Sequence, residues 1–356
     1  MEQAIQDFRD RISAASGERP LCIRGGGSKD WYGGAPRGDL LDTRAYRGIV
    51  AYDPTELVIT ARSGTPLAEI DAVLAEKNQM LAFEPPHFGD GATVGGMVAA
   101  GLSGPRRAAV GALRDFVLGA VLMNHRGEVL HFGGQVMKNV AGYDVSRVLA
   151  GSLGTLGLLL EVSLKVLPRP FEETTLRFDM EQADAIRLLN EWGGQPLPIS
   201  GSVWLDGVLA VRLSGAAPAL RGARIRMGGE EVADAGDFWH SLREQQHSFF
   251  EPMADASLWR LSVPSVAPPL ELTGSQLIEW GGAQRWLHSA APAAALRAAA
   301  TAAGGHATLF RAGAAHAGRD AVFHPLSPAV AGIQRRLKQA FDPAGIFNPG
   351  RLGQDY

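Results

Sequence analysis

Three glycine-dense loops between residues 21 and 170 decide the fold of this chain. They read IRGGGSK (residues 23–29), DGATVGG (residues 90–96) and AGSLGTLG (residues 150–157), and each adjoins an apolar, strand-like run. Glycine permits positive φ angles and lets a ligand approach the main chain closely. Successive uncovered N–H groups form anion-binding nests. Three such loops in one domain therefore predict a large phosphate-bearing cofactor held mainly by backbone.

The loops do not follow the commonest phosphate-binding patterns. No Gly-x-Gly-x-x-Gly segment follows a strand, and no Gly-Lys pair is present to form a Walker-type loop. Residues 150–154 resemble the Gly-x-Ser-x-Gly elbow of hydrolases, but Ala150 replaces the first glycine and no acid–histidine order stands out. A Rossmann fold and a hydrolase are therefore disfavoured. Because a single glycine loop is more often a plain turn, the prediction rests on the order and flanks of all three.

Length and composition indicate an ordinary globular protein. The chain has 356 residues, which allows two domains, and 46% of them are hydrophobic. The formal net charge of −3 and the interspersed charges do not indicate a nucleic acid partner. With Cys22 as its single cysteine, the chain cannot form an internal disulfide or ligate an iron–sulfur cluster through cysteines of its own. We expect Cys22 to pack as a small hydrophobic residue in a strand interior, and we expect no metal site.

Short apolar runs bounded by turn residues predict the elements of the first half. Residues 1–16 form a helix pattern without the basic start and apolar core of a signal peptide, and uncharged runs stay below the ~18 residues of a membrane span. We therefore expect a cytoplasmic protein. Thr65 is expected to cap a helix that has Pro66 at its first position. The predicted strands lie at residues 20–24, 40–42, 48–52, 56–61, 115–123, 128–132 and 158–167.

A Pro-Arg-Pro sequence at residues 168–170 indicates a domain boundary. Beyond it, Asp206-Gly207 and Gly281-Gly282 each separate two strand-like runs and predict hairpins. Helices are expected at residues 181–192, 237–249, 291–303 and 327–340. The predicted class is α+β, with helices on one face of an antiparallel sheet. We assign residues 1–170 to a cofactor domain, 171–340 to an α+β cap domain and 341–356 to a tail that returns to the first domain.

The three loops, in this order, resemble the FAD-binding domain of the vanillyl-alcohol-oxidase and p-cresol-methylhydroxylase (PCMH) type over residues 20–170. The resemblance implies a domain of two α/β subdomains that binds FAD. It implies that the first two loops wrap the FAD pyrophosphate and that residues 154–161 line the adenine and ribose side. The cofactor-binding residues expected in this way are Arg24, Gly25, Gly26, Gly27, Ser28, Lys29, Pro86, Gly91, Ala92, Thr93, Gly95, Gly96, Gly101, Gly154, Thr155, Gly157 and Leu158.

Longer segments resemble a narrower family, the FAD-binding subunits of bacterial glycolate oxidase (glycolate dehydrogenase) complexes. They include YDPTELVITAR (residues 52–62), VMKNVAGYD (136–144) and FNPGR (347–351), and they span nearly the whole chain. The resemblance implies an FAD-dependent oxidoreductase subunit that works with a second flavoprotein and an iron–sulfur subunit to oxidise glycolate to glyoxylate. Any peripheral association with the inner membrane would come through these partners. Because the first loop contains no histidine, we expect the FAD to be non-covalent.

One departure from related FAD-linked 2-hydroxyacid dehydrogenases bears on mechanism. Those enzymes carry a His-x-Gly-Asp-Gly-Asn-x-His segment, whereas residues 306–313 here contain one histidine and no acid. We therefore assign no catalytic residue, and we expect His316 and His324 to be surface or loop residues. Three functions stay open: an electron-relaying subunit, which we favour, a self-sufficient 2-hydroxyacid dehydrogenase, and a subunit whose flavin is structural or lost.

Several polar and aromatic residues have more than one interpretation. Arg106 and Arg107 could contact cofactor phosphates, a partner's acidic surface or only solvent. Lys138 and Tyr143 are weaker candidates for reaching the cofactor. The strand-like tryptophans are expected in the sheet core rather than in a stacking site; they are Trp204, Trp259, Trp280 and Trp286.

Overall fold

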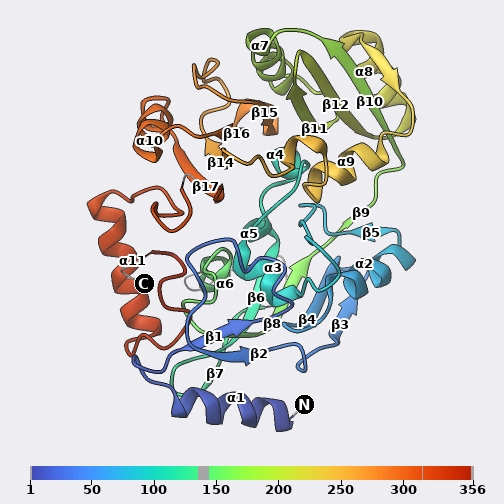
Figure 1. Cartoon of the computed structure of the whole chain (residues 1–356). Helices are drawn as coiled ribbons and strands as arrows, with labels where there is room; N and C mark the ends of the chain where they lie inside the picture. Colours follow the sequence, from blue (N-terminus) through green and yellow to red (C-terminus); the bar gives the residue numbers. More distant parts are fainter. Residues whose placement is uncertain (1, 135–143, 315, 354–356) are drawn as a thin grey trace. The chain divides into compact units, whose positions relative to one another are not determined.

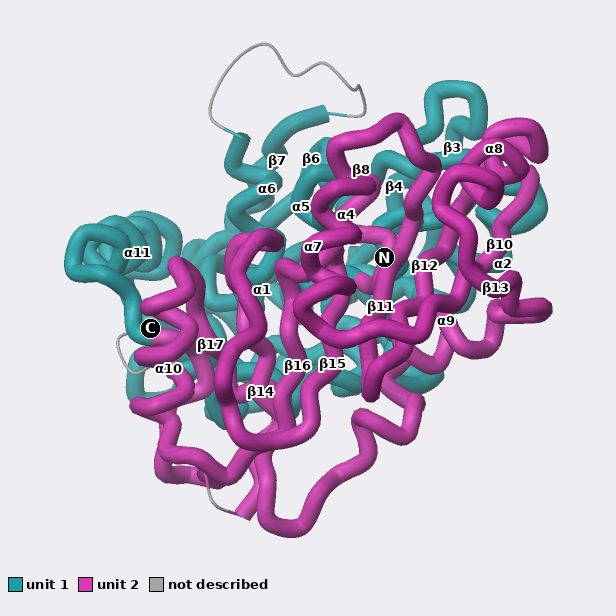
Figure 2. Tube along the Cα trace, turned by 90° about the horizontal axis from the view of Figure 1, so that it is seen from above, with its two compact units in different colours: residues 1–103, 111–169, 325–356 teal, residues 104–110, 170–324 magenta. Residues whose placement is uncertain are grey.

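The computed structural model describes residues 2–134, 144–314 and 316–353. The chain forms two compact units (Figure 2): unit 1 comprises Met1–Ser103, Gly111–Arg169 and Pro325–Tyr356, and unit 2 comprises Gly104–Val110 and Pro170–His324. The chain thus passes into unit 2 at Gly104, returns at Gly111, and re-enters unit 1 after His324. The domain division that we expect at residues 170 and 340 stays a prediction.

Unit 1 contains a five-stranded antiparallel sheet with strand order β3-β4-β8-β6-β7 and a separate parallel pair, β1 and β2 (Figure 1). A two-residue antiparallel pair, β5 and β9, completes its strands. The strands are β1 (Leu21–Arg24), β2 (Asp39–Asp42), β3 (Ile49–Asp53), β4 (Val58–Arg62), β5 (Gln79–Met80), β6 (Val117–Met123), β7 (Val129–Gly133), β8 (Leu158–Lys165) and β9 (Leu167–Pro168). The helices are α1 (Glu2–Ala14), α2 (Leu67–Glu76), α3 (Val94–Ala100), α5 (Leu113–Phe116), α6 (Val145–Leu149) and α11 (Pro328–Phe341).

The apolar stripe of α1 explains how the parallel pair joins the rest of unit 1. Phe8 and Ile12 recur at helical spacing and are buried in one cluster with Leu21, Leu158 and Phe347. This cluster joins α1, the strand β1 before the first glycine loop, and the strand β8 after the third. The core therefore brings together chain segments that carry two of the three loops.

One local prediction in unit 1 is wrong. Helix α2 begins at Leu67, so Pro66 is its N-cap residue rather than its first helical residue, and no side chain caps the helix. The hydroxyl of Thr65 instead accepts the N–H of Gly48 at 2.9 Å and contacts the carbonyl oxygen of Gly48 at 3.2 Å. Tertiary pairing with a neighbouring turn has thus taken the hydroxyl that the sequence pattern assigned to the helix.

Unit 2 is built on an eight-stranded antiparallel sheet with strand order β13-β10-β12-β11-β15-β16-β14-β17. The α+β class is therefore confirmed, and both predicted hairpins form, β11–β12 around Asp206-Gly207 and β15–β16 around Gly281-Gly282. The strands are β10 (Glu172–Asp179), β11 (Ile199–Leu205), β12 (Val208–Gly215), β13 (Glu230–Val232), β14 (Ser257–Ser262), β15 (Gln276–Glu279), β16 (Gln284–Ser289) and β17 (His306–Arg311). The helices are α4 (Arg107–Val110), α7 (Gln182–Gly193), α8 (Ala217–Met227), α9 (Gly236–Arg243) and α10 (Ala293–Ala302), with 3-10 turns η1 (Ser248–Phe250) and η2 (Trp280–Gly282).

Arg106 and Arg107 are used inside unit 2 rather than on a solvated loop. Arg106 is 5% exposed, forms an ion pair with Glu173 and donates to Ser214 Oγ at 3.1 Å. The guanidinium of Arg107 lies 4.3 Å from the ring centre of Trp280. These two contacts fix residues 104–110 to unit 2.

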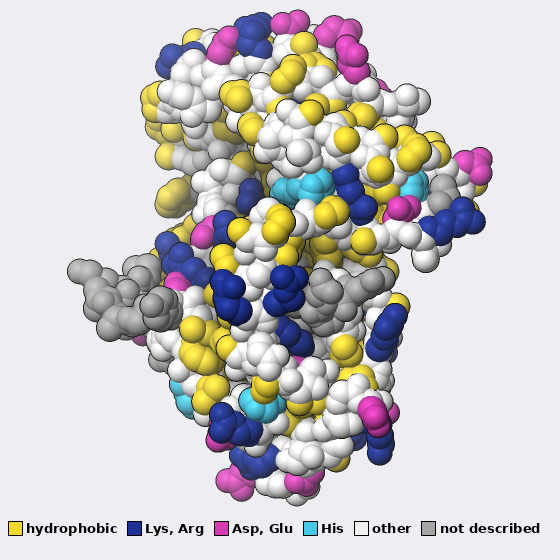
Figure 3. Space-filling model, turned by 90° about the vertical axis from the view of Figure 1, so that its left-hand side faces the viewer, with side chains coloured by type: hydrophobic (Ala, Val, Ile, Leu, Met, Phe, Trp, Pro, Cys, Tyr) yellow, Lys and Arg dark blue, Asp and Glu magenta, His cyan; other side chains and the backbone are white. Residues whose placement is uncertain are grey.

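The predicted core tryptophans are confirmed in part. Trp259 and Trp286 are buried in unit 2, whereas Trp204 and Trp280 are half-buried. Acidic and basic side chains both occur from one end to the other of the face in Figure 3, as the interspersed charges of the sequence predict. No helix among the residues that the structure describes is long and apolar enough to span a membrane.

Candidate cofactor site

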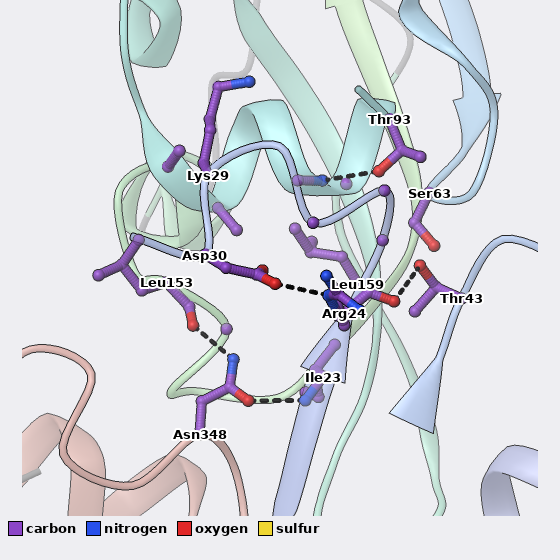
Figure 4. A pocket seen from close by; sticks show the side chains of 18 of the residues that line it. Ile23, Arg24, Lys29, Asp30, Thr43, Ser63, Thr93, Leu153, Leu159 and Asn348 are labelled. Carbon is purple, nitrogen blue, oxygen red and sulfur yellow. Dashed lines mark hydrogen bonds and ion pairs between the residues drawn. The ribbon is translucent and has the colours of Figure 1, made fainter. Parts of the chain in front are cut away.

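A pocket of unit 1 lies where the glycine loops meet (Figure 4). The space that it encloses, open mouth included, is about 830 Å³. Residues of all three loops, of β8 and of the C-terminal tail line it together. The expected cofactor residues that line it are Arg24, Gly25, Gly26, Gly27, Ser28, Lys29, Thr93, Gly95, Gly96, Gly154 and Gly157.

The first loop presents backbone donors at this pocket. The pairing of β1 with β2 ends where the N–H of Thr43 donates to the carbonyl of Arg24 at 3.0 Å. The loop closes where the N–H of Asp30 donates to the carbonyl of Gly27 at 3.1 Å. Between these bonds, the N–H groups of residues 25–28 have no acceptor among the described residues. Successive N–H groups without an acceptor are the donors that anion nests use, so the loop suits the phosphate oxygens of a nucleotide cofactor.

The second loop uses its glycines differently from our expectation. The N–H of Gly95 donates to the carbonyl of Ser63 at 2.8 Å, and the N–H of Gly96 donates to Thr93 Oγ1 at 3.3 Å as a cap of α3. These two N–H groups are therefore not bare donors. A Cβ at Gly26 would overlap the carbonyl oxygen of Gly91, because the first two loops pack backbone against backbone. Glycine is required here by close packing of the chain on itself.

The third loop meets the C-terminal tail at the wall of the pocket. Asn348 and Arg351 both line the pocket, although sequence analysis did not include them among the site residues. Asn348 Nδ2 donates to the carbonyl of Leu153 at 2.6 Å, and its Oδ1 accepts the N–H of Ile23 at 2.7 Å (Figure 4). The FNPGR segment lies in the tail that the sequence predicts to return to the first domain, and this is the signal that could have identified both residues.

Six expected cofactor residues do not line the pocket. Pro86, Ala92 and Leu158 are buried, and Leu158 belongs to the core cluster that includes Phe8 and Ile12 of α1. Thr155 is fully buried, and its hydroxyl donates to the carbonyl of Ser152 at 2.8 Å. Gly91 and Gly101 serve chain packing: Gly91 faces the first loop, and Gly101 ends α3 with φ +66°.

The charges at the pocket are largely paired. Arg24 forms an ion pair with Asp30 at 2.6 Å, and Lys29 Nζ donates to the carbonyl of His87 at 3.1 Å. Cys22 lies within β1, as expected, but it is half-buried and lines the pocket. Burial, and then the carboxylate of Asp30, raise the pKa of its thiol, so it stays protonated at neutral pH. Ser63 is buried, and its Oγ has no partner within the described part of the chain.

The histidines at and after the departure from the dehydrogenase segment lie in unit 2, and none of them is among the residues that line the pocket. His306 begins β17, and the Nδ1 of His324 accepts the N–H of Ala307 at 3.2 Å. His316 lies in a turn, as one of the two expected placements, but it is buried, and Ser257 Oγ and the carbonyl of Ala291 contact its two ring nitrogens. No group of three or more His, Cys, Asp or Glu side chains in the described ranges could hold a metal. Lys138 and Tyr143 lie outside the described residues.

Comparison with known proteins agrees with the geometry of the pocket. Residues 4–133 match the family of FAD binding domains. Glycolate oxidase subunit GlcE of Escherichia coli (strain K12) is 52% identical over 339 residues, which cover 95% of this chain and 94% of that protein. The chain belongs to the GlcE family. Its cofactor is FAD, and it is an FAD-dependent oxidoreductase subunit, as the resemblance implied.

More distant proteins match part or nearly all of this GlcE-family chain. Glycolate oxidase subunit GlcD of Bacillus subtilis (strain 168) is 31% identical over 169 residues, which cover 47% of this chain and 36% of that protein. Among solved structures, an alkyldihydroxyacetonephosphate synthase matches with a TM-score of 0.66 at 14% identity, and the match covers 98% of this chain and 75% of that one. The match to the synthase covers both units, so the fold is shared beyond the GlcE family.

Proposed function

We propose that this chain is the FAD-carrying GlcE-type subunit of a complex that oxidises glycolate to glyoxylate, and that glycolate itself is oxidised on a partner subunit. The substrate class comes from the family, since the GlcE relative is named as a glycolate oxidase subunit. The observation that carries the cofactor assignment is the run of N–H groups at residues 25–28, which have no acceptor among the described residues and belong to residues that line the pocket.

The residues of the pocket fit FAD in specific roles. FAD, when bound, supplies the redox chemistry, and the protein supplies binding, orientation and electrostatics. The N–H groups of residues 25–28 would bind pyrophosphate oxygens, while Gly154, Gly157 and Leu159 would line the adenine and ribose side. Attachment is non-covalent in this proposal, because the first loop has no histidine and the protonated thiol of Cys22 is a poor nucleophile.

The proposed division of labour rests on the side chains that surround the pocket. Abstraction of protons from a 2-hydroxy acid needs a positioned base, which typically contributes about 10²–10⁴-fold to rate. No histidine is among the residues that line the pocket of unit 1. The partners in this proposal are a second FAD-containing subunit and an iron–sulfur subunit. The match to a GlcD subunit supports a common origin of the two flavoproteins.

Two measurements on the purified full chain test the proposal. Acid precipitation should release yellow flavin into the supernatant, and flavin retained in the pellet would contradict non-covalent binding. Anaerobic stopped-flow mixing with glycolate should leave the oxidised flavin band largely intact on the turnover timescale of the complex. Rapid and complete bleaching of the chain alone would instead identify it as a self-sufficient dehydrogenase.

A further inference from the structure

We propose that the C-terminal segment at residues 346–351 is part of the FAD site, and that its docking is coupled to FAD binding through Asn348 and Arg351. The inference rests on the proposed function, because it takes FAD as the ligand of the pocket. Asn348 and Arg351 act here as positioning residues, since they hold the loops that line the pocket.

The segment is fixed at its base by a buried ion pair. Lys338, in the last turn of α11, donates from Nζ to Asp342 Oδ2 at 2.6 Å and to the carbonyl of Thr155 in the third loop at 2.7 Å. Asp342 accepts the N–H groups of Ile346 and Phe347 at 3.0 and 2.8 Å. The start of the segment is therefore held against the third glycine loop before it reaches the pocket.

Asn348 joins the first and third loops directly. Asn348 is 6% exposed, and its amide is shared between the N–H of Ile23, at the start of the first loop, and the carbonyl of Leu153 in the third. The main chain beside it pairs with β1. The N–H of Leu21 donates to the carbonyl of Ile346 at 2.7 Å, and the N–H of Asn348 donates to the carbonyl of Leu21 at 3.0 Å. One side chain thus sets the separation of two walls of the pocket.

Arg351 fixes the stretch that follows the first loop. Its guanidinium is 7% exposed and donates to the carbonyls of Asp30 at 2.8 Å, Tyr32 at 2.7 Å and Gly34 at 2.6 Å. These carbonyls curve around one guanidinium, so Arg351 holds the far end of the loop whose near end is held by Asn348. The free donors at residues 25–28 lie between these two anchors.

Coupling follows from this arrangement. When the tail is displaced, the N–H of Ile23 and the carbonyls of Leu153 and Asp30 lose their hydrogen bonds to Asn348 and Arg351. The distance between the first and third loops is then no longer fixed by the tail. A cofactor that contacts both loops favours the state in which that separation is fixed. Linkage is reciprocal, so FAD must stabilise the docked tail by the same factor by which the docked tail raises FAD affinity.

The first experiment removes the amide of Asn348 and measures the dissociation constant for FAD on the full chain by flavin fluorescence. Because Asn348 has φ +43°, Asn348→Gly removes the amide without straining the backbone. We expect FAD to bind about tenfold more weakly, within the usual range of coupling between sites. The matched control is Asn124→Gly. Asn124 is 7% exposed, its Oδ1 accepts the N–H groups of Arg126 and Glu128, and its Nδ2 donates to the carboxylate of Glu128. Asn124 is not among the residues that line the pocket.

The control separates positioning from general stability. Both variants should lower the melting temperature of the FAD-free chain, but only Asn348→Gly should raise the dissociation constant measured on the folded protein. Arg351→Lys keeps the charge and loses the planar fork, so it should also weaken FAD binding. Equal dissociation constants for Asn348→Gly and the parent chain would overturn the proposal.

The second experiment measures peptide-level hydrogen–deuterium exchange with and without saturating FAD. We expect FAD to slow exchange both in the first loop and in the peptide that contains residues 346–351. Protection of the first loop without any change in the tail would refute the coupling and leave the proposed function standing. No protection in either peptide would instead refute FAD binding at this pocket, so the two failures are distinguishable.

Discussion

Two buried arginines, one in each unit, hold three main-chain carbonyls apiece, yet their surroundings differ. Arg285 of unit 2 is 1% exposed and donates to the carbonyls of Gly282, Pro268 and Ala267. Arg351 of unit 1 does the same for Asp30, Tyr32 and Gly34. Burial lowers the pKa of both guanidinium groups, that of Arg285 to about 10. Both residues therefore remain charged at neutral pH and act as bridges between chain segments.

The difference lies in what remains unpaired beside each arginine. The loop anchored by Arg351 keeps four consecutive N–H groups without an acceptor among the described residues, and it lines a pocket. The glycine turn beside Arg285 joins β15 to β16, and its Gly281 N–H donates to Ser202 Oγ at 3.0 Å. In our proposal the first glycine loop of unit 1 binds a ligand, whereas the N–H of Gly281 in the turn of unit 2 is bonded within the chain. Free donors, rather than glycine content, distinguish the two.

The largest effect is expected from a methyl group in the first loop. Gly26→Ala places a Cβ on the carbonyl oxygen of Gly91, so the first two loops must separate. FAD affinity should fall at least about 100-fold, equivalent to roughly 2.7 kcal/mol, by titration with flavin fluorescence. Gly222→Ala in α8 of unit 2 is the control, because a Cβ there meets no atom within 4 Å. Normal flavin content in Gly26→Ala would show that the loops are not packed as described.

Replacement of the two arginines tests the comparison directly. Arg285→Met leaves three carbonyls without a donor and should lower the free energy of unfolding by about 3 kcal/mol, measured by urea titration, without changing FAD affinity. Arg351→Met should lower stability similarly and also weaken FAD binding. If Arg285→Met reduced FAD affinity of the folded chain as strongly, the contrast between the units would be lost.

Acidification should destabilise unit 2 through its histidines. Burial lowers the pKa of His288, His306 and His324, so the folded chain holds these imidazoles neutral. The unfolded chain then binds more protons, and the free energy of unfolding decreases as the pH falls below about 6.5. Melting temperatures of the FAD-free chain between pH 8 and 5 should show this decrease. His288→Gln should make the dependence shallower, and an unchanged slope would exclude His288 as a contributor.

The smallest effect concerns the unpaired hydroxyl in the pocket wall. Ser63→Ala removes a buried Oγ that has no partner among the described residues, so the FAD-free chain should keep its unfolding free energy within about 0.5 kcal/mol. Ser163→Ala is the matched change, because Ser163 Oγ is bonded to Thr60 Oγ1 at 2.8 Å, and it should cost about 1 kcal/mol. Equal losses in urea titrations would contradict the unpaired state of Ser63.

The sequence predicted the class, both hairpins and eleven of the 23 residues that line the pocket, because these depend on local turn chemistry and on glycine. It did not predict which glycine N–H groups stay free. Gly95 and Gly26 look alike in the sequence, but Ser63, some thirty residues away, accepts the N–H of Gly95. The role of Asn348 was not predicted for the same reason, since its two hydrogen-bond partners lie about 325 and 195 residues away along the chain. Partners that distant leave no local pattern.

The excursion at residues 104–110 determines how this protein can be cut and recombined. The chain crosses between the units at Gly104, Gly111, Pro170 and Pro325, so neither unit is one continuous stretch of sequence. A fragment that begins at Pro170 would lack Arg106 and leave Glu173 without its guanidinium partner. A chimaera that exchanges the cap between GlcE relatives must therefore carry the short excursion with it. Residues 104–110, and not only the boundary at Pro170, must therefore come from the same parent as the rest of unit 2, so that Arg106 keeps its contact with Glu173.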